Sequence, residues 1–306
     1  MKNMNKLIVA GGSGFMGQHL IESLRNRFKE VVVLTRHKSR SEDNMRWVQW
    51  DGKNHGNWAN ELENADLLIN LCGKSVDCRH NAKNREEIIT SRVNSTLALG
   101  AAAICCVNPP STWVNAASAT IYRHEEKWPM DEKQGIIGEG FSVEVCQKWE
   151  STFAQIPVPG TRKITLRTAL VLGKAGGVLN RLKTIAQLGL GGYQGSGNQK
   201  MSWVHEDDFV NMVLFCHQNE HIEGVINCCA PHPLNNRRFM SKLRKELHVP
   251  MGLPLPKPLI NLGALLIGTE PELVLKSRYV MPRRMMEAGY PFQFPHLNQA
   301  LQHLLR

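Results

Sequence analysis

Short apolar runs alternate with helical patterns over residues 1–172 of the chain. Apolar residues recur at the helical period of about 3.6 residues in three segments, Met16–Phe28, Arg85–Cys105 and Phe141–Phe153. Six shorter runs between them are typical of buried strands: Lys6–Ala10, Val31–Thr35, Arg46–Trp50, Leu67–Leu71, Thr112–Ala116 and Ile164–Leu170. This alternation predicts an α/β fold of the Rossmann type, with a doubly wound parallel sheet and crossover helices.

The pattern changes after Leu172. Residues 173–197 are rich in glycine, and prolines punctuate short helical patterns from Pro231 to the C-terminus. A helix at Asp207–His217 and a strand at Val225–Cys228 are expected to return to the main sheet. We therefore predict a Rossmann domain of residues 1–172 plus about 203–230. Residues about 173–202 plus 231–306 are expected to form a smaller, mostly helical substrate or lid domain.

Composition excludes some compartments and partners. With 42% hydrophobic and 21% charged residues the chain can bury a core, yet no apolar run approaches the roughly 20 residues that span a bilayer. The eight cysteines include two adjacent pairs and form no C-x-x-C motif, which favours free thiols in a reducing compartment. We therefore expect a cytoplasmic protein that does not bind membranes.

A net charge of +10 raises the question of a nucleic-acid partner. The basic residues are scattered, without a basic block or interleaved aromatic residues, so no nucleic-acid binding is predicted. A phosphorylated small ligand accounts for the charge equally well. His217 and His221 have the spacing of a metal-binding pair on the predicted helix, but no third ligand is suitably spaced, so no metal site is predicted.

A glycine turn directly follows the first predicted strand and opens a helix. In this turn Gly11 permits the tight bend, Gly14 lets backbone amides approach a pyrophosphate, and Gly17 allows close packing of helix on strand. Phe15 and Met16 complete the predicted contact surface, where the helix N-terminus faces the phosphate charge. The alternative is a glycine-rich turn that binds nothing. The strand–turn–helix context favours dinucleotide binding.

The end of the second predicted strand indicates which dinucleotide binds. An NAD site places an acidic residue there for the ribose hydroxyls, whereas this chain has Thr35 and Arg36 and no carboxylate before Glu42. A guanidinium at this point pairs with a 2′-phosphate, so NADP(H) is predicted. The alternative is that Arg36 is simply an exposed residue of a basic loop.

Two further strand ends lie close to this predicted cofactor. Asp51 either accepts a hydrogen bond from the adenine amino group or forms the turn Trp50-Asp51-Gly52. Leu71, Cys72 and Gly73 end the fourth strand, where the crevice of a doubly wound sheet holds its ligand.

Several motifs are spread over nearly the whole length. They are the glycine turn, Leu34-Thr35-Arg36, Asn70-Leu71-Cys72-Gly73, Ser91-Arg92-Val93, Ser118-Ala-Thr-Ile-Tyr122, Ser202-Trp-Val-His205 and Val280-Met-Pro282-Arg283. Together they resemble atypical, extended-type short-chain dehydrogenase/reductases known as an epimerase family. This group is similar to NAD-dependent epimerases and dehydratases, has bacterial members labelled cell-division inhibitors, and carries its own C-terminal module.

The resemblance implies cofactor contacts from residues outside the glycine turn. These are Thr35, Arg36, Leu71, Cys72, Glu87, Arg92 and Val171. A cofactor contact from Arg92 is also expected apart from the resemblance, because a cation on the helix after the fourth strand can reach a cofactor phosphate or ribose. Its alternative is an ordinary surface salt bridge.

The expected catalytic pair is missing. Enzymes of this superfamily use a Ser or Thr together with Tyr-x-x-x-Lys, and Ser118 matches the serine. Counting back from Glu150 places Ser142 at the tyrosine position and Cys146 at the lysine position. Tyr122 is a candidate substitute acid, with a packing residue as its alternative.

His205 is a second candidate acid, although a structural role is favoured for it and for Asp208. Two functions therefore stay open. One is an NADP(H)-dependent oxidoreductase or epimerase-like enzyme that acts on an unidentified small molecule, such as a sugar nucleotide or carbonyl compound. The other is a catalytically silent NADP(H)-binding regulator or redox sensor. Analogy with the fold, and nothing else, suggests a homodimer.

Overall fold

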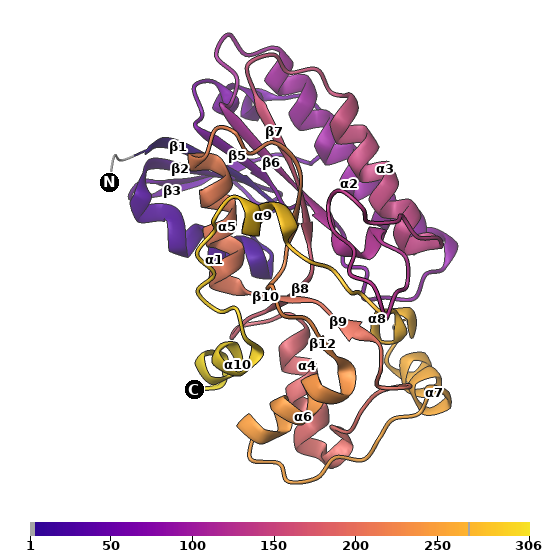
Figure 1. Ribbon diagram of the computed structural model, residues 1–306. Coiled ribbons are helices and arrows are strands. Elements are labelled where there is room, and N and C mark those ends of the chain that lie inside the picture. The colour runs from indigo at the N-terminus through magenta and orange to yellow at the C-terminus, as the bar shows by residue number, and fades with distance from the viewer. Residues whose placement is uncertain (1–3, 269) are drawn as a thin grey trace.

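A central eight-stranded sheet organises the computed structural model, which describes residues 4–268 and 270–306 (Figure 1). The strand order is β11-β7-β6-β5-β1-β2-β4-β3, and every pairing is parallel except that of β3 with β4. The strands are β1 (Met4–Ala10), β2 (Phe28–Thr35), β3 (Arg40–Glu42), β4 (Met45–Gln49), β5 (Leu67–Asn70), β6 (Thr112–Ser118), β7 (Arg162–Thr168) and β11 (Gly224–Cys228).

The order of the strands creates the crevice. The chain moves outward from β1 through β2 to β4, then returns to the other side of β1 with β5. Ala10 is level with Leu34 of β2 and with Asn70 of β5, so the carboxyl ends of three strands meet at one edge. This reversal is the topological switch point at which doubly wound sheets bind ligands.

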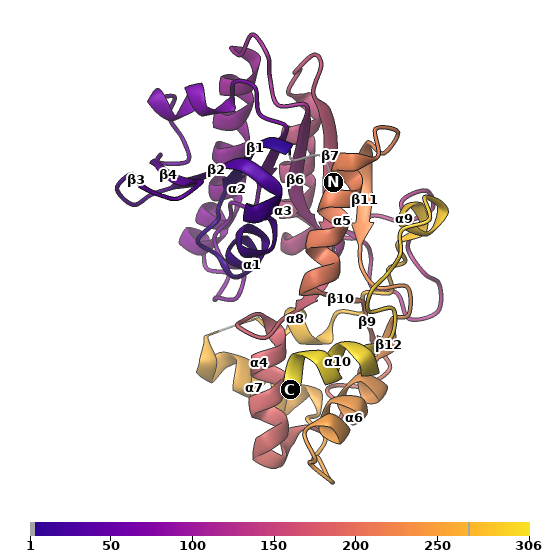
Figure 2. The same cartoon turned by 90° about the vertical axis from the view of Figure 1, so that its left-hand side faces the viewer.

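Helices cover both faces of the sheet (Figures 1 and 2). Leu7 and Val9 belong to a buried cluster with residues of α1 (Phe15–Leu24) and α5 (Glu206–Gln218). Ile8 and Ala10 point the other way, into a cluster with α2 (Ala82–Ile104) and, through Phe153, with α3 (Phe141–Gln155). Alternate residues of one strand thus enter two cores, which explains the continuous apolar runs Leu7–Ala10, Val31–Leu34 and Leu67–Ile69 in the central strands.

The remaining elements lie mostly below the sheet in both views. Two short sheets pair β8 (Leu170–Leu172) with β10 (Trp203–His205) and β9 (Lys200–Met201) with β12 (Leu234–Asn235). The helices are α4 (Val178–Ile185), α6 (Asn236–Glu246), α7 (Lys257–Ile267), α8 (Glu272–Leu275), α9 (Arg283–Glu287) and α10 (Leu297–Leu305). Short helical turns occur at η1 (Arg25–Arg27), η2 (Asn57–Leu62), η3 (Ala119–Ile121) and η4 (Ala186–Leu190).

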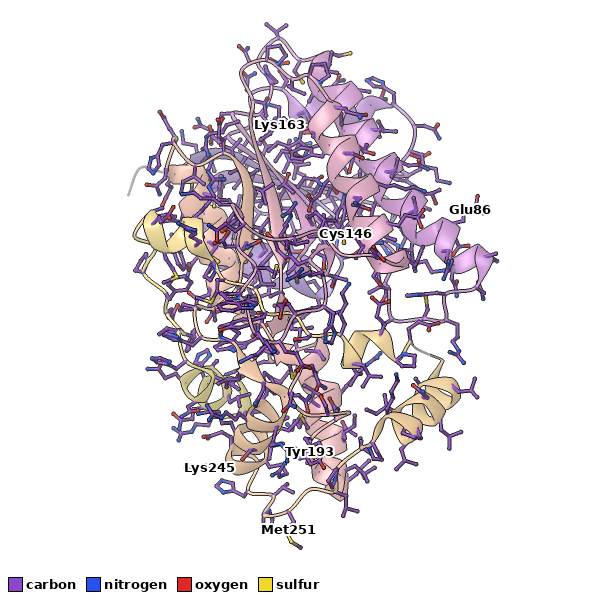
Figure 3. All side chains as sticks on the ribbon, turned by 45° about the vertical axis from the view of Figure 1, so that its right-hand side comes forward. Glu86, Cys146, Lys163, Tyr193, Lys245 and Met251 are labelled. Atoms are coloured by element: carbon purple, nitrogen blue, oxygen red, sulfur yellow. The ribbon has the colours of Figure 1, made fainter. Side chains whose placement is uncertain are left out.

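This lower part has a hydrophobic core of its own. Residues of α4, α6 and α10, including Leu182, Phe239 and Leu301, pack around Trp203. In Figure 3, Tyr193, Lys245 and Met251 lie in this part, whereas Lys163 and Cys146 lie in the part built on the sheet. The division into two domains at the residues given above stays a prediction.

The fold class predicted from the sequence is confirmed, and several boundaries are corrected. The first helix ends at Leu24, because η1 follows and Phe28 already begins β2. The strand predicted at Ile164–Leu170 is interrupted at Ala169, after which β8 leaves the main sheet to pair with β10. The strand at the predicted Val225–Cys228 does return to the main sheet, beside β7.

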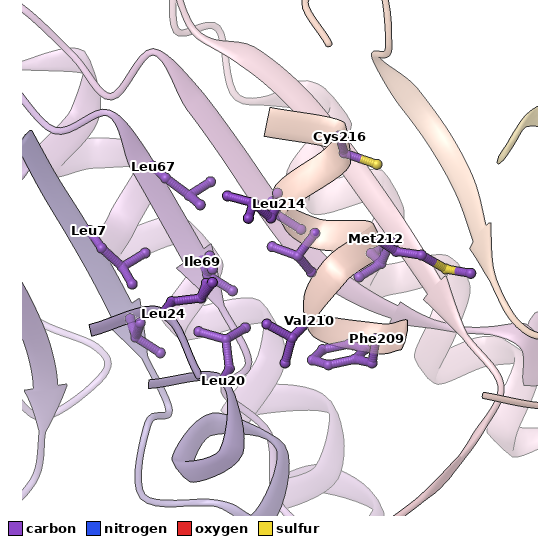
Figure 4. Packing of buried hydrophobic residues seen from close by; sticks show 14 of the residues in the cluster. Leu7, Leu20, Leu24, Leu67, Ile69, Phe209, Val210, Met212, Leu214 and Cys216 are labelled. Carbon is purple, nitrogen blue, oxygen red and sulfur yellow. The ribbon is translucent and has the colours of Figure 1, made fainter. Parts of the chain in front are cut away.

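The interior between α1, α5 and the sheet is close-packed and apolar. Figure 4 shows Leu20 of α1 and Val210 of α5 meeting over Ile69 of β5. This packing holds the start of α1 rigidly against the strand ends, which positions the crevice described next. Among the described residues, no helix combines the length and apolar character that crossing a bilayer requires.

Candidate cofactor and active site

The glycine turn lies directly against the end of β5. Gly11 has φ +82°, and a Cβ at this residue would lie 2.8 Å from the carbonyl carbon of Leu71. A Cβ on Gly17 would lie 2.7 Å from the carbonyl oxygen of Gly11. The predicted tight turn at Gly11 and close packing at Gly17 are therefore confirmed, since any larger residue would push the turn away from the sheet.

The amino end of α1 has no side-chain cap in the described part of the chain. Its N-cap residue is Gly14, which has no side chain to accept a hydrogen bond from the first amides of the helix. These amides and the helix dipole together form an anion-binding end beside the crevice. The approach of a pyrophosphate to Gly14 and Met16 stays a prediction.

The ring of Phe15 also has contacts within the protein, and its predicted contact with the cofactor stays a prediction. A Cβ on Gly176 would lie 2.8 Å from the Phe15 ring, and one on Gly173 would overlap both that ring and the carboxylate of Glu206. The ring therefore packs under the loop that follows β8, which joins the first turn of α1 to the lower part of the molecule. Val171 of β8 packs against the core of α1 and α5.

The end of β2 opens on a cavity of about 670 Å³ between α1 and the edge of the sheet. Thr35 is buried, and its hydroxyl accepts a hydrogen bond of 3.3 Å from the amide of His37. Arg36 is exposed, and its charge acts on Cys72 across the crevice. The residues that line the cavity include the cations of Arg25, Lys38 and Arg40 and the carboxylate of Glu22, whereas Arg36 is not part of the lining. Positive charge therefore predominates in the cavity next to Arg36.

Buried amides fix the end of β5. The side-chain amide of Asn70 donates to Asn115 at 2.8 Å, and its oxygen accepts from the backbone amide of Cys72 at 3.1 Å. Because buried polar groups need such partners, this network sets the direction of the chain at Leu71 and Cys72. Burial raises the pKa of the Cys72 thiol to about 12, so this residue stays a neutral thiol.

Arg92 lies against Gly73. A Cβ on Gly73 would lie 2.9 Å from the Arg92 guanidinium carbon, and this guanidinium donates to the carbonyl oxygens of Lys74 and Ile88 at 3.0 and 2.8 Å. It also lies 5.1 Å from the centre of the Trp149 ring. The contacts of Arg92 in the described part of the chain are thus carbonyl groups and a ring, not the carboxylate of a surface salt bridge.

Two other predicted contacts have ordinary local roles. The carboxylate of Asp51 accepts hydrogen bonds of 2.8 Å from the amides of Lys53 and Asn54, as a turn-forming residue does. Glu87 is half-buried and pairs with Lys74, which lowers the pKa of its carboxyl group. The turn interpretation of Asp51 is therefore the one that its geometry favours.

Ser118 ends β6 and begins the turn η3. Its hydroxyl accepts a hydrogen bond of 3.2 Å from the amide of Thr120. Tyr122 lies four residues later but points into the core, where its hydroxyl donates to Asn227 and accepts from Arg167, both at 2.9 Å. Burial raises the pKa of Tyr122. A fully engaged, buried phenol favours a packing role over proton transfer.

The residues at the tyrosine and lysine positions lie on α3. Cys146 is buried, and desolvation raises the pKa of its thiol to about 12, so it carries no charge at neutral pH (Figure 3). Ser142 donates a hydrogen bond of 3.2 Å to the carboxylate of Glu272. Glu150 forms a bidentate ion pair with Arg167, at 2.9 and 2.7 Å, and this pair anchors α3 to β7.

The structure adds residues that the sequence analysis did not identify. Lys276 donates a hydrogen bond of 3.0 Å to the carbonyl oxygen of Thr120, and Arg278 donates one of 3.0 Å to the hydroxyl of the same threonine. The segment after α8 thus reaches the turn that carries Ser118. Its proline-punctuated surroundings have no periodicity, so no sequence signal pointed to this contact.

Three histidine and acidic residues meet at the start of α5. His205, Asp207 and His303 place potential metal-binding atoms within 4.8 Å of one another. However, Nδ1 of His205 accepts the amide of Asp207 at 3.0 Å, which leaves its proton on Nε2, 3.1 Å from Nδ1 of His303. Metal binding through Nε2 would remove this proton and the cap, so the geometry favours a structural role.

The other histidine pair is corrected by the helix boundary. Helix α5 ends at Gln218, so His221 lies beyond it, and the His217 ring contacts the hydroxyl of Thr112 at 3.0 Å. Asp208, in contrast, has the structural role favoured above. Its carboxylate accepts hydrogen bonds from Tyr290, Gln293 and Phe294, which ties the C-terminal segment to α5.

Comparison with known proteins places this geometry in context. The model of the NAD dependent epimerase/dehydratase family matches residues 7–229, and a domain of unknown function, DUF1731, matches residues 255–304. The epimerase family protein SDR39U1 of Bos taurus is 29% identical over 98% of this chain and 99% of its own length. The epimerase family protein YfhF of Bacillus subtilis is 28% identical over 98% and 97%.

A solved structure extends the likeness to three dimensions. The crystal structure of human epimerase family protein SDR39U1 with NADPH has a TM-score of 0.86 and 28% sequence identity, and the match covers 98% of each chain. These matches confirm the resemblance inferred from the motifs, including that of the C-terminal module.

Proposed function

Because the chain belongs to the NAD dependent epimerase/dehydratase family, we propose that it binds NADP(H) and acts as an oxidoreductase or epimerase-like enzyme on a small molecule. The observation that carries this proposal is the open amino end of α1, held by Gly11 and Gly17 against the end of β5. A backbone cradle that a single Cβ would fill fits a pyrophosphate.

The basic cavity at the end of β2 supports the phosphorylated cofactor. Arg36, His37 and Lys38 follow β2 without an acidic residue, so a 2′-phosphate would meet positive charge there. The human SDR39U1 structure that resembles this chain contains NADPH. On this basis Arg36 would hold the 2′-phosphate, and Arg92 would face the cofactor from the other side of the crevice.

The cofactor, when bound, would supply or accept a hydride at its nicotinamide ring. Ser118 lies at the end of β6, where its hydroxyl can donate a hydrogen bond to a substrate oxygen. Neither Ser142 nor Cys146 can act as the usual tyrosine and lysine, because Cys146 is an uncharged thiol. Proton transfer therefore needs another group, or water, in this family member.

Titration of purified protein with NADPH and NADH by calorimetry tests the cofactor assignment. We expect tighter binding of NADPH, and a roughly tenfold loss of NADPH affinity in Arg36→Ala with little change for NADH, because one charge-assisted contact is removed. Arg238→Ala, which removes an exposed arginine on α6, is the control. Equal losses for both dinucleotides, or tighter NADH binding by the unmodified chain, would contradict the assignment.

Turnover is tested separately with NADPH and a panel of carbonyl compounds and sugar nucleotides. The uncharged Cys146 also supports a second candidate function, a regulator or redox sensor that binds NADP(H) without chemistry. That candidate expects no turnover, together with a partner whose association depends on the redox state of the cofactor. Pull-downs that are identical with NADP, NADPH and no cofactor would count against it.

A further inference from the structure

A second cavity, of about 700 Å³, lies where the loop after β6 meets the C-terminal segment. Its polar lining comes from Arg123, His124, Glu139, Lys257, Glu272 and Lys276. The backbone of Arg123 is fixed by hydrogen bonds to the segment 136–138, since its amide donates to Ile136 at 2.9 Å and Gly138 donates to Ile121 at 2.9 Å. The cavity wall is therefore ordered backbone on the side of β6.

This cavity borders the predicted reaction centre. Lys276 donates to the carbonyl oxygen of Thr120, two residues after Ser118. Glu272, in the same wall, accepts a hydrogen bond from Ser142, which holds the position of the missing tyrosine. The two residues also pair with each other, with 3.6 Å between the Lys276 ammonium and the Glu272 carboxylate. One charged pair thus separates the cavity from both Ser118 and Ser142.

The lining carries charges of both signs, with the basic residues Arg123, His124, Lys257 and Lys276 and the carboxylates of Glu139 and Glu272. The Nε of Arg123 is buried and has no hydrogen-bond partner in the described part of the chain, while its Nη2 donates to Glu125 at 2.8 Å. Nδ1 of His124 accepts from the amide of Ser277, so in the neutral ring the proton is on Nε2. Lys257 adds a further cation to the lining. Because the basic side chains outnumber the two carboxylates, the cavity favours an anionic ligand.

We propose that this cavity is the substrate site of the proposed enzyme and that it takes a substrate bearing a carboxylate or phosphate group, held by Lys276 and Arg123. The inference rests on the proposed function. Lys276 then has a second effect. Its positive charge lies next to the turn that carries Ser118, whereas the uncharged Cys146 provides no charge there. The DUF1731 segment would then contribute to the reaction centre.

Calorimetric titration of anion probes into NADPH-saturated protein tests the inference, since the cofactor then fills its own phosphate sites. Malonate is the carboxylate probe and inorganic phosphate is the phosphate probe. We expect one of them to bind with a dissociation constant on the order of 1 mM. Lys276→Met should weaken this binding roughly tenfold, the effect of one charged contact. Lys276→Arg should retain most of it, which guards against a variant that merely misfolds.

The matched control is Lys148→Met. Lys148 also pairs with a glutamate four residues away, Glu144, but on the exposed surface of α3. Absence of binding by both probes, or equal binding by the Lys276→Met and Lys148→Met variants, would overturn the inference.

The outcome is separable from that of the proposed function. Wild-type protein that binds NADPH but neither anion refutes only the substrate site. Protein that does not bind NADPH refutes the proposed function, and the anion titrations then compare Lys276→Met with Lys148→Met in its absence. Specific loss in Lys276→Met would still support the anion site, and no difference would still overturn it.

Discussion

The cofactor end and the reaction end of the crevice are held together by different kinds of contact. At the cofactor end two close approaches are between backbone segments, with Gly11 against Leu71 and Gly17 against Gly11. At the reaction end the contacts are between side chains from distant segments, such as Ser142 with Glu272 and Arg167 with Tyr122. A backbone-built end admits almost no substitution, whereas a side-chain-built end can exchange its chemistry residue by residue. This difference explains how the chain keeps a dinucleotide turn while lacking Tyr-x-x-x-Lys.

The strongest test of this contrast is Gly11→Val. A valine at φ +82° is strained, and its Cβ would lie 2.8 Å from the Leu71 carbonyl carbon. We expect a loss of about 3 kcal/mol or more in the free energy of unfolding, together with loss of measurable NADPH binding. Urea unfolding and calorimetry measure the two effects. Gly263→Ala in α7, where a Cβ meets nothing within 4 Å, should leave cofactor binding unchanged. Normal cofactor affinity in Gly11→Val would refute the description of a closed backbone cradle.

At the reaction end, we expect the stability of the protein to depend on ion-pair partners rather than on close backbone packing. Arg167→Met leaves the Glu150 carboxylate partly buried without its cation, because both side chains are little exposed. We expect the free energy of unfolding to fall by about 3 kcal/mol in urea titrations. Lys148→Met, which removes an exposed pair with Glu144, should cost less than about 1 kcal/mol. Similar losses in both variants would show that burial does not distinguish the two pairs.

Acid should weaken the junction between α5 and the C-terminal helix α10. Burial lowers the pKa of His205 from 6.5 to about 4 in the folded protein. The unfolded chain therefore takes up this proton first, so the free energy of unfolding should fall as the pH decreases from 6.5 toward 4. Its slope from this group is at most about 1.4 kcal/mol per pH unit.

The raised pKa of His19, which bonds to Asp207, opposes part of this slope, because its contribution is present below pH 6.5 and is lost as the pH rises. Urea unfolding at pH 6.5 and 4.5 measures the sum. His205→Asn preserves a capping side chain and should reduce the acid loss. An unchanged pH dependence in this variant would exclude His205 as its source.

The smallest expected effect concerns Tyr122. Tyr122→Phe removes a hydroxyl that Asn227 and Arg167 both contact, so we expect a loss of about 1 kcal/mol in the free energy of unfolding. NADPH affinity should not change, since the hydroxyl points into the core. If a substrate is found, a turnover loss of a hundredfold or more, on the order of a general acid's contribution, would restore Tyr122 as a catalytic residue.

The sequence predicted what depends on neighbours in the chain. The glycine turn consists of seven consecutive residues. The central strands β1, β2 and β5 are recognisable because apolar residues lie on both of their faces. The break at Ala169 has no local signal, because neither glycine nor proline interrupts the chain from Ile164 to Leu172, and only pairing with Trp203–His205 divides this segment. Lys276 was missed for a similar reason. It contacts Thr120 across 156 positions of the chain, a distance over which no local pattern carries information.

The ring of Phe15 connects two parts of the molecule. Phe15 lies in the first turn of α1, and its ring packs against the loop at Gly173, Gly176 and Gly177. A ligand that displaces this ring when it binds beside α1 therefore alters the free energy with which a second ligand binds beside the loop. Thermodynamic linkage makes such an influence equal in both directions. The order in which two ligands bind would then change the affinity measured at each step, but not the total free energy of binding both.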